Sequence, residues 1–192
     1  MRIRKEIQAM PRQAGVRILY FRHGQSEANV ARQISDDPSR IVNLTDTGRV
    51  QAQGARDLLS GIVLSCAYAS EFPRAQQTAS ILLNGGEFRV DPRINERKSG
   101  MDGRSVQEFN DLVRNDPAGF CPPGGESFFD EMQRVKDFMD EMAERHSGGT
   151  ILAVSHENPI LAALALCGQD PAEAALGDIA NCEKIEVTWP RS

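Results

Sequence analysis

Two of the three histidines in this sequence directly follow short apolar runs. His23 comes after residues 18–21 and Arg22, and His156 comes after residues 151–154 and Ser155. Apolar runs of this length are typical of buried strands. Ligands of open α/β sheets bind in the crevice at the carboxyl ends of the parallel strands. We therefore expect both imidazoles to face one pocket.

A second cation is predicted to join this pocket from another strand end. Arg74 lies shortly after the apolar residues 66–70, at a third strand-to-helix junction. The guanidiniums of Arg22 and Arg74 would repel each other unless an anion lay between them. Arginine forks match phosphate oxygens bidentately, and the helix N-termini that follow the strands add free N–H groups. The pocket is predicted to bind a phosphate.

An imidazole that faces phosphorus can react as well as bind, because its neutral form is a nucleophile near pH 7. A phosphohistidine intermediate on His23 is therefore conceivable. Such chemistry needs a proton donor for the leaving oxygen, and Glu96 is the best-placed carboxylate in the polar segment that follows residue 90. An anionic phosphate would raise the pKa of Glu96 and keep it protonated. Taken alone, Glu96 also fits a solvated surface acid.

Strands and helices alternate along the predicted chain. Strands are expected at residues 16–21, 66–70, 88–90, 150–154 and 184–189. Helices are expected at residues 26–33, 46–60, 73–83, 106–113, 128–147 and 159–167. This alternation predicts an α/β fold, a three-layer α/β/α sandwich with a mostly parallel central sheet.

Apolar spacing also predicts which helix faces are buried. In the helix at residues 46–60, Val50, Gly54 and Leu58 form one stripe, with Ala55 and Leu59 beside them. In the helix that begins at residue 128, the stripe consists of Phe128, Met132, Val135, Met139 and Met142. We interpret this second stripe as core packing.

The 192 residues suffice for a single domain with a sizeable core. Residues 1–14 are expected to form a basic surface extension, because no signal-peptide pattern follows their cations. Residues 15–192 are then one domain. Within it, residues 91–123 are too poor in apolar side chains to form their own core, and we expect them to be a small insertion that covers the pocket.

Composition narrows the partners and the compartment. The net charge of −5 disfavours a broad nucleic-acid surface, and no apolar run approaches the roughly 20 residues that span a bilayer. The four cysteines lack metal-ligand spacing, which disfavours a zinc site and favours reduced thiols and a cytoplasmic location. The expected partner is a small phosphorylated substrate, without nucleic acid or membrane. A homodimer is left open.

The ordered motifs resemble those of the histidine phosphatase superfamily, in its phosphoglycerate mutase-like branch. The matching segments are Arg22-His23-Gly24, Leu44-Thr45-Asp46-Thr47-Gly48, the stretch from Ser70 to Ala79 around Arg74, Glu96, Gly124-Gly125-Glu126-Ser127 and Ser155-His156. The set runs through residues 16–189.

The resemblance implies a role for each matching residue. His23 would be the phosphorylated nucleophile, and Arg22, Arg74 and His156 would hold the phosphoryl oxygens with help from Asn29. Glu96 would protonate the leaving alcohol and later activate water. Neither a metal nor a cofactor is implied, because the arginines and the second histidine supply the charge that Mg²⁺ supplies elsewhere.

Some positions depart from the family's pattern, and the residue after the second histidine bears most directly on phosphate binding. Glu157 stands where a small residue usually follows the second histidine. A carboxylate at this position would repel a phosphate unless it points away or pairs with an arginine.

Three functions remain in competition. We favour a phosphomonoesterase, a metal-independent histidine phosphatase that acts on a small phosphorylated metabolite. A phosphoglycerate-type mutase is the alternative, because Arg97 and Arg32 could hold a second anionic group. A catalytically silent phosphate-binding module is the third. Arg97 could also form a basic lip with Lys98 and Arg104, although we favour solvated surface charge as the explanation of these three residues.

Overall fold

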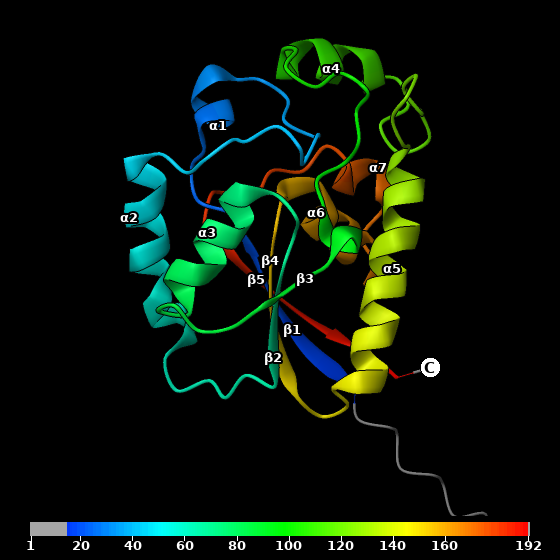
Figure 1. The fold of residues 1–192 in the computed structure, drawn as a ribbon. Coiled ribbons are helices and arrows are strands. Elements are labelled where there is room, and N and C mark those ends of the chain that lie inside the picture. The colour runs from blue at the N-terminus through cyan, green and yellow to red at the C-terminus, as the bar shows by residue number, and fades with distance from the viewer. Residues whose placement is uncertain (1–14, 192) are drawn as a thin grey trace, which may run out of the picture.

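The computed structural model describes residues 15–191, so the predicted extension at residues 1–14 lies outside the described residues. Within the described chain, one sheet contains β1 (Val16–Arg22), β2 (Cys66–Ala69), β3 (Arg89–Val90), β4 (Thr150–Ser155) and β5 (Lys184–Trp189). Its strand order is β3-β2-β4-β1-β5 (Figure 1). All neighbouring pairs are parallel except β1 and β5. The predicted mostly parallel sheet is confirmed.

The register of the two central strands brings the histidine-bearing ends together. β1 and β4 are adjacent, and Arg22 pairs with Ser155. The backbone N–H of His23 donates to the Ser155 carbonyl over 3.0 Å. His23 and His156 therefore leave the sheet side by side, at its carboxyl edge.

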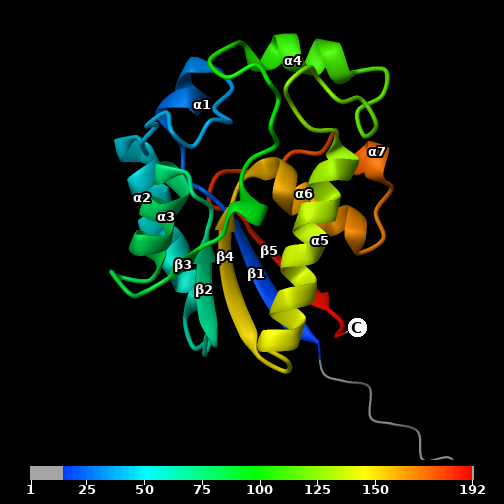
Figure 2. The same ribbon diagram turned by 45° about the vertical axis from the view of Figure 1, so that its right-hand side comes forward.

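Helices cover both faces of the sheet (Figure 2). On one face lie α2 (Asp46–Ala55) and α3 (Pro73–Leu82), which share a core with Leu19, Phe21 and Val154. On the other face lie α5 (Phe128–Arg145), α6 (Glu157–Leu166) and α7 (Pro171–Ala174), which share a core with Ile18 and Tyr20. Successive strand residues point to opposite faces, so each strand supplies both cores. The three-layer prediction is confirmed.

Side-chain caps explain where three of the helices begin. Ser26 caps α1 (Glu27–Ala31) and Ser127 caps α5, and in both cases the residue three positions on completes a capping box. Thr45 caps α2 by accepting from the Gly48 N–H. Such caps satisfy N–H groups that have no partner within the helix.

The prediction for residues 46–60 was wrong in two respects. α2 ends at Ala55, and residues 56–59 form a 3₁₀ turn, η1 (Arg56–Leu59). The buried face of α2 consists of Gly48, Ala52 and Ala55, whereas Val50 is 66% exposed. Close contact of Gly48 with the loop after β1 fixes this rotation of the helix, and no apolar period can reveal that contact.

Residues 91–123 contain η2 (Pro92–Ile94) and α4 (Val106–Val113). In Figure 1, α4 lies beyond the carboxyl edge of the sheet, near α1. The Arg104 carbonyl accepts from the Ile34 N–H over 2.8 Å, so this segment is tied to the loop that follows α1. The two loops together wall one end of the molecule.

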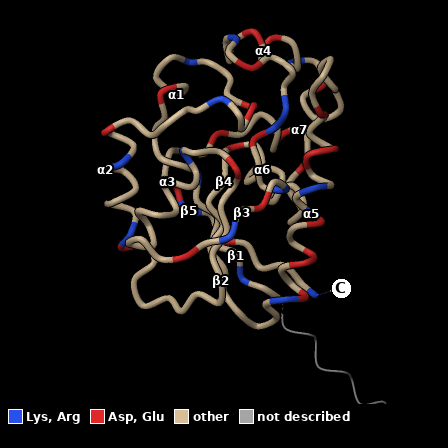
Figure 3. Tube along the Cα trace, in the orientation of Figure 1, with Lys and Arg blue, Asp and Glu red and all other residues tan. Residues whose placement is uncertain are grey.

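Charged residues of both signs are spread along the described part of the chain. Figure 3 shows Lys and Arg interspersed with Asp and Glu along the trace. Among residues 15–191, no helix is both long enough and apolar enough to cross a bilayer.

Candidate active site

The structure brings His23, His156 and Arg74 into direct contact. The centroids of the two imidazole rings lie 5.0 Å apart, and both residues are buried. Arg74, in the first turn of α3, bridges them. Its Nε lies 3.1 Å from His23 Nε2, and its Nη2 lies 3.2 Å from His156 Nδ1. Three strand ends thus converge on one point.

Hydrogen bonds fix the tautomer of His23. Its Nδ1 lies 2.7 Å from the Gly24 carbonyl, which can only accept, so Nδ1 carries the proton. The other ring nitrogen, Nε2, is unprotonated, and its lone pair accepts from Arg74. Burial, followed by the positive charges of Arg74 and Arg22, lowers the pKa of His23 well below 6.5. A neutral imidazole with an unprotonated Nε2 is the nucleophilic form.

His156 has the opposite tautomer. Its Nδ1 accepts from Arg74, which has only donors, and its Nε2 donates to the Ser70 hydroxyl over 2.7 Å. Burial, with the charges of Arg74 and His23, lowers the pKa of His156 too. An anion that replaced Arg74 beside Nδ1 would favour protonation of this nitrogen, because opposite charges stabilise the charged form.

Arg74 is held on a second side by the loop after α1. Its two terminal nitrogens donate to the hydroxyl and carbonyl of Ser35, over 2.9 and 2.8 Å. Burial lowers its pKa to about 10, so the guanidinium stays charged at neutral pH. This loop therefore sets the position of the cation between the two histidines.

Arg22 is the last residue of β1, and its guanidinium forms an ion pair with Glu157. Its Nη2 lies 2.8 Å from Glu157 Oε2, and its Nη1 donates to the Ile179 carbonyl. Its Nε is buried and has no hydrogen-bond partner among the described residues. A buried donor without a partner costs free energy, and an anionic ligand would satisfy it.

Glu96 lies in the wall of a cavity of about 740 Å³. Its Oε1 accepts from the Arg97 N–H over 3.0 Å and from Asn158 Nδ2 over 3.1 Å. Asn158 stands two residues after His156, in the first turn of α6. The second histidine and the candidate acid are thus held by one turn of helix.

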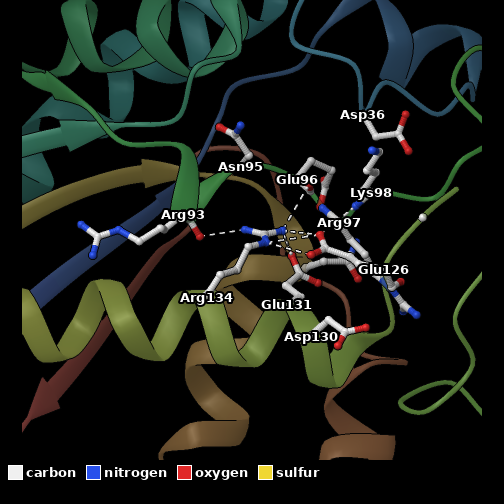
Figure 4. A network of polar contacts seen from close by, with 12 residues as sticks. Asp36, Arg93, Asn95, Glu96, Arg97, Lys98, Glu126, Asp130, Glu131 and Arg134 are labelled. Carbon is white, nitrogen blue, oxygen red and sulfur yellow. Dashed lines mark hydrogen bonds and ion pairs between the residues drawn. The ribbon is translucent and has the colours of Figure 1, made fainter.

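Arg134 of α5 secures the segment that carries Glu96 (Figure 4). It donates to the carbonyls of Arg93 and Glu96, over 2.7 and 3.4 Å. It also pairs with the carboxylates of Glu126 and Glu131, over 2.7 and 3.1 Å. The backbone around Glu96 is therefore fixed to the long helix.

The two remaining predicted residues lie differently. Asn29 completes the capping box of α1, and its Oδ1 accepts from the N–H of Ser26. Arg97 is not brought to the histidines: it is buried, and its guanidinium donates to the carbonyls of Pro117, Phe120 and Glu126. Burial lowers the pKa of Arg97. This arginine supports the covering segment.

Glycines allow the loop after His23 to lie against α2. A Cβ on Gly24 would lie 2.4 Å from the Gly48 carbonyl oxygen, and a Cβ on Gly48 would lie 2.0 Å from the Gln25 carbonyl oxygen. The backbone after His23 is therefore in direct contact with the first turn of α2.

Sequence reasoning missed four residues that position the site: Ser35, Ser70, Asn158 and Asn181. Asn181 donates to the His23 carbonyl over 2.9 Å. Ser70 was detectable, because it ends a predicted strand beside Arg74. The other three act across long sequence separations and give no local signal.

No group of three or more His, Cys, Asp or Glu side chains within residues 15–191 is arranged to hold a metal ion. The charged groups closest to the two histidines are arginines, whose N–H donors bind anions.

Comparisons with known proteins agree with this geometry. The chain is 30% identical over 171 residues to the adenosylcobalamin/alpha-ribazole phosphatase of Escherichia coli (strain K12), covering 83% of this chain and 82% of that protein. It is 29% identical over 174 residues to a 2,3-bisphosphoglycerate-dependent phosphoglycerate mutase of Mesorhizobium japonicum, covering 81% and 84%. The solved structure of mycobacterial hydrolase 1 superposes with a TM-score of 0.79 at 26% identity, covering 90% of this chain and 91% of that one.

A family model agrees over nearly the whole chain. The model of the histidine phosphatase superfamily (branch 1) matches residues 18–192. With the two histidines, the two arginines and their strand ends in place, the chain belongs to the histidine phosphatase superfamily.

Proposed function

We propose that this protein is a metal-independent phosphomonoesterase that hydrolyses a small phosphorylated metabolite through a phosphohistidine on His23. The observation that carries the proposal is the tautomer of His23. Its Nδ1 proton is held by the Gly24 carbonyl, so the Nε2 lone pair faces the Arg74 guanidinium. A phosphoryl group bound by Arg74 would place phosphorus next to this lone pair.

Three side chains are positioned to bind the phosphoryl oxygens. Arg74 offers its guanidinium, Arg22 offers the buried Nε that has no partner among residues 15–191, and His156 offers Nδ1 once it is protonated. Together they stabilise the negative charge of the transition state at a site where both histidines and Arg74 are buried. Asn29 assists from α1, because its Oδ1 is engaged and its amide donors remain for the ligand.

The reaction has two steps. In the first, His23 Nε2 forms a bond to phosphorus while the ester P–O bond breaks, and Glu96 gives its proton to the departing alcohol oxygen. In the second, Glu96 takes a proton from water, the water oxygen attacks phosphorus, and the N–P bond breaks. Inorganic phosphate leaves, and His23 and Glu96 return to their starting forms. No step requires a metal.

The relative in Escherichia coli supports this reaction class, since its name describes a phosphatase of a small metabolite. The relative in Mesorhizobium japonicum is named a phosphoglycerate mutase, which supports mutase activity as the alternative function. A mutase returns the phosphoryl group to a second hydroxyl of the substrate instead of to water. Free phosphate is therefore the product that separates the two reactions.

The test is trapping of the phosphoenzyme with an alkaline quench. Wild-type protein mixed with radiolabelled p-nitrophenyl phosphate should carry label that is acid-labile and base-stable, and it should release free phosphate. His23→Ala should carry none. His146→Ala is the matched control, because His146 bonds Tyr68 away from the site. Label that persists in His23→Ala would overturn the proposal.

A further inference from the structure

The cavity beside Glu96 has a charge distribution that bears on the alcohol part of the substrate. It measures about 740 Å³, and its wall includes Asp36, Asp37, Glu96, Lys98, Asp102 and Glu126. Glu96 is the proposed proton donor to the leaving oxygen, and Ser35, next to Asp36, holds Arg74. The cavity therefore borders both Glu96 and the loop that holds Arg74, and the alcohol part of a bound substrate would extend toward it.

Two of the carboxylates in the wall are neutralised by arginines. Asp102 lies 2.6 Å from Arg40 Nε, and Glu126 lies 2.7 Å from Arg134 Nη2. Burial of Asp102 opposes its ionisation, but hydrogen bonds from Arg40 and from the backbone of Asp36 and Asp37, together with the charge of Arg40, lower its pKa. Each ion pair neutralises the arginine as well as the carboxylate. Neither arginine remains free to bind a second anion of the substrate.

Two other carboxylates in the wall have only neutral donors. Asp36 Oδ2 accepts from the Ser99 hydroxyl over 2.6 Å, and Asp37 Oδ1 accepts from the Ser39 hydroxyl over 2.7 Å. The two Ser39 hydrogen bonds lower the pKa of Asp37, so its carboxylate stays charged at neutral pH. Hydroxyl donors stabilise a carboxylate without cancelling its charge.

The cations expected to form a basic lip are mostly committed elsewhere. The guanidinium of Arg97 donates to backbone carbonyls, and Arg104 pairs with Glu108 over 3.2 Å. Among the described residues that line the cavity, Lys98 is the one cation without an ion-pair partner. Figure 4 shows Lys98, Asp36 and Glu96 around the same part of the polar network. The unneutralised carboxylates therefore outnumber the unneutralised cations.

We infer that the substrate is a phosphomonoester whose alcohol part carries hydrogen-bond donors, hydroxyl or ammonium groups, and no second anionic group. Asp36 and Asp37 are its specificity-determining residues. Carboxylates accept hydrogen bonds from such donors and repel a carboxylate or second phosphate. This inference rests on the proposed function and adds the substrate class, and it disfavours bisphosphates and phosphorylated acids.

The test measures competition rather than turnover, so it gives a result for every ligand. p-Nitrophenyl phosphate hydrolysis is followed at pH 7 while phosphoethanolamine, glycerol phosphate, 3-phosphoglycerate or inorganic phosphate competes. We expect phosphoethanolamine and glycerol phosphate to bind at least as tightly as inorganic phosphate. We expect 3-phosphoglycerate to bind about tenfold more weakly than glycerol phosphate. Its additional carboxylate is repelled by the acidic wall of a partly hydrated cavity, and a loss of affinity of this size is typical of one such repulsion.

Substitutions at Asp37 test whether the cavity wall causes the preference for glycerol phosphate over 3-phosphoglycerate. In Asp37→Lys, the affinity for 3-phosphoglycerate relative to that for glycerol phosphate should rise by about tenfold. In Asp37→Asn this affinity ratio should rise by a smaller factor. Asp37 is exposed, so neither change disturbs the core. Asp57→Lys is the matched control: Asp57 is exposed on η1 and lines a different hollow, so the ratio should stay unchanged.

The outcomes separate this inference from the function on which it rests. If wild-type protein binds 3-phosphoglycerate as tightly as glycerol phosphate, or if Asp37→Lys leaves the ratio unchanged, the substrate class is wrong while the phosphatase stands. If p-nitrophenyl phosphate is not hydrolysed and His23 carries no label, the proposed function itself fails.

Discussion

Glu157 Oε2 lies 2.8 Å from Arg22 Nη2, so a carboxylate of the protein occupies one donor of an arginine proposed to bind phosphate. Glu157 is the first residue of α6, directly after His156. Burial raises its pKa to about 7 against the opposing charge of Arg22, and the nearby carboxylates of Asp178 and Glu96 act in the same direction as burial. Pairing with an arginine is one of the two arrangements under which we expected this residue to be compatible with a phosphate site.

Replacing Glu157 by glutamine should make phosphate binding less sensitive to pH. Below about pH 7 Glu157 is mostly neutral and releases Arg22, and above it the ionised carboxylate competes with the ligand. Glu157→Gln should therefore bind inorganic phosphate about fivefold more tightly than wild type at pH 8, which corresponds to about 1 kcal/mol, and equally well at pH 6. The measurement is competition against p-nitrophenyl phosphate across this range.

Phosphate itself titrates in the same range, but equally for both proteins, so the ratio of their affinities isolates Glu157. Asp178→Asn is the control, because Asp178 is 3.8 Å from Arg22 and its side chain is 90% exposed. Its effect should stay below about twofold. A wild-type to Glu157→Gln ratio that does not change between pH 6 and pH 8 would contradict the role given to this carboxylate.

Removing the Ser70 hydroxyl should impair catalysis by releasing the tautomer of His156. The His156 Nε2 proton then loses its acceptor, so the doubly protonated ring that would donate from Nδ1 to the phosphoryl group is less stabilised. We expect kcat to fall about tenfold in Ser70→Ala, the cost of one buried hydrogen bond. The imidazole ¹⁵N chemical shifts of His156 report the tautomer directly.

Ser155→Ala is the matched control for this change. Ser155 is also a buried serine beside His156, but its hydroxyl donates to the Ile94 carbonyl and not to the ring. Its loss should lower stability without changing the ring-nitrogen shifts. Equal loss of kcat in both variants, with unchanged shifts, would mean that the two hydroxyls act only on packing.

Arg97 should matter for stability and not for substrate choice. Its guanidinium is buried and donates to the carbonyls of Pro117, Phe120 and Glu126. Arg97→Ala leaves these acceptors unsatisfied, and the free energy of unfolding should fall by about 3 kcal/mol. Urea denaturation measures this loss. Lys98→Ala, at the exposed neighbouring position, should be nearly neutral for stability. If Arg97→Ala keeps its stability but changes the preference between glycerol phosphate and 3-phosphoglycerate, the prediction that Arg97 contacts the substrate would be supported instead.

The elements that sequence reasoning predicted well are those fixed by local chemistry. The apolar runs that end at Arg22 and Ser155 are strands, and Ser127 begins α5 because its hydroxyl and the Asp130 carboxylate complete a capping box. Both signals lie within a few residues of the structure that they determine. The convergence of the strand ends then follows from the parallel topology.

The parts that could not be predicted depend on contacts between distant segments. Ser35 reaches Arg74 across 39 positions, and Asn158 reaches Glu96 across 62. No spacing in the sequence encodes such a pair. The misassigned face of α2 has the same origin, because its rotation is set by Gly48 against Gln25 in the loop after His23.

That contact gives the last prediction, since it couples α2 to the nucleophile. In Gly48→Ala the new methyl would lie 2.0 Å from the Gln25 carbonyl oxygen, so the loop that positions His23 must move. A displacement of about 1 Å at reacting atoms can cost about 10²-fold in rate, and we expect a loss of kcat/KM for p-nitrophenyl phosphate of this order.

Gly54→Ala is the control on the same helix, where a Cβ meets nothing within 4 Å. That change should keep full activity and raise stability by about 0.5–1 kcal/mol, because alanine favours the helix. Full activity in Gly48→Ala would show that the loop after β1 tolerates movement and that His23 is positioned by β1 and Arg74 alone.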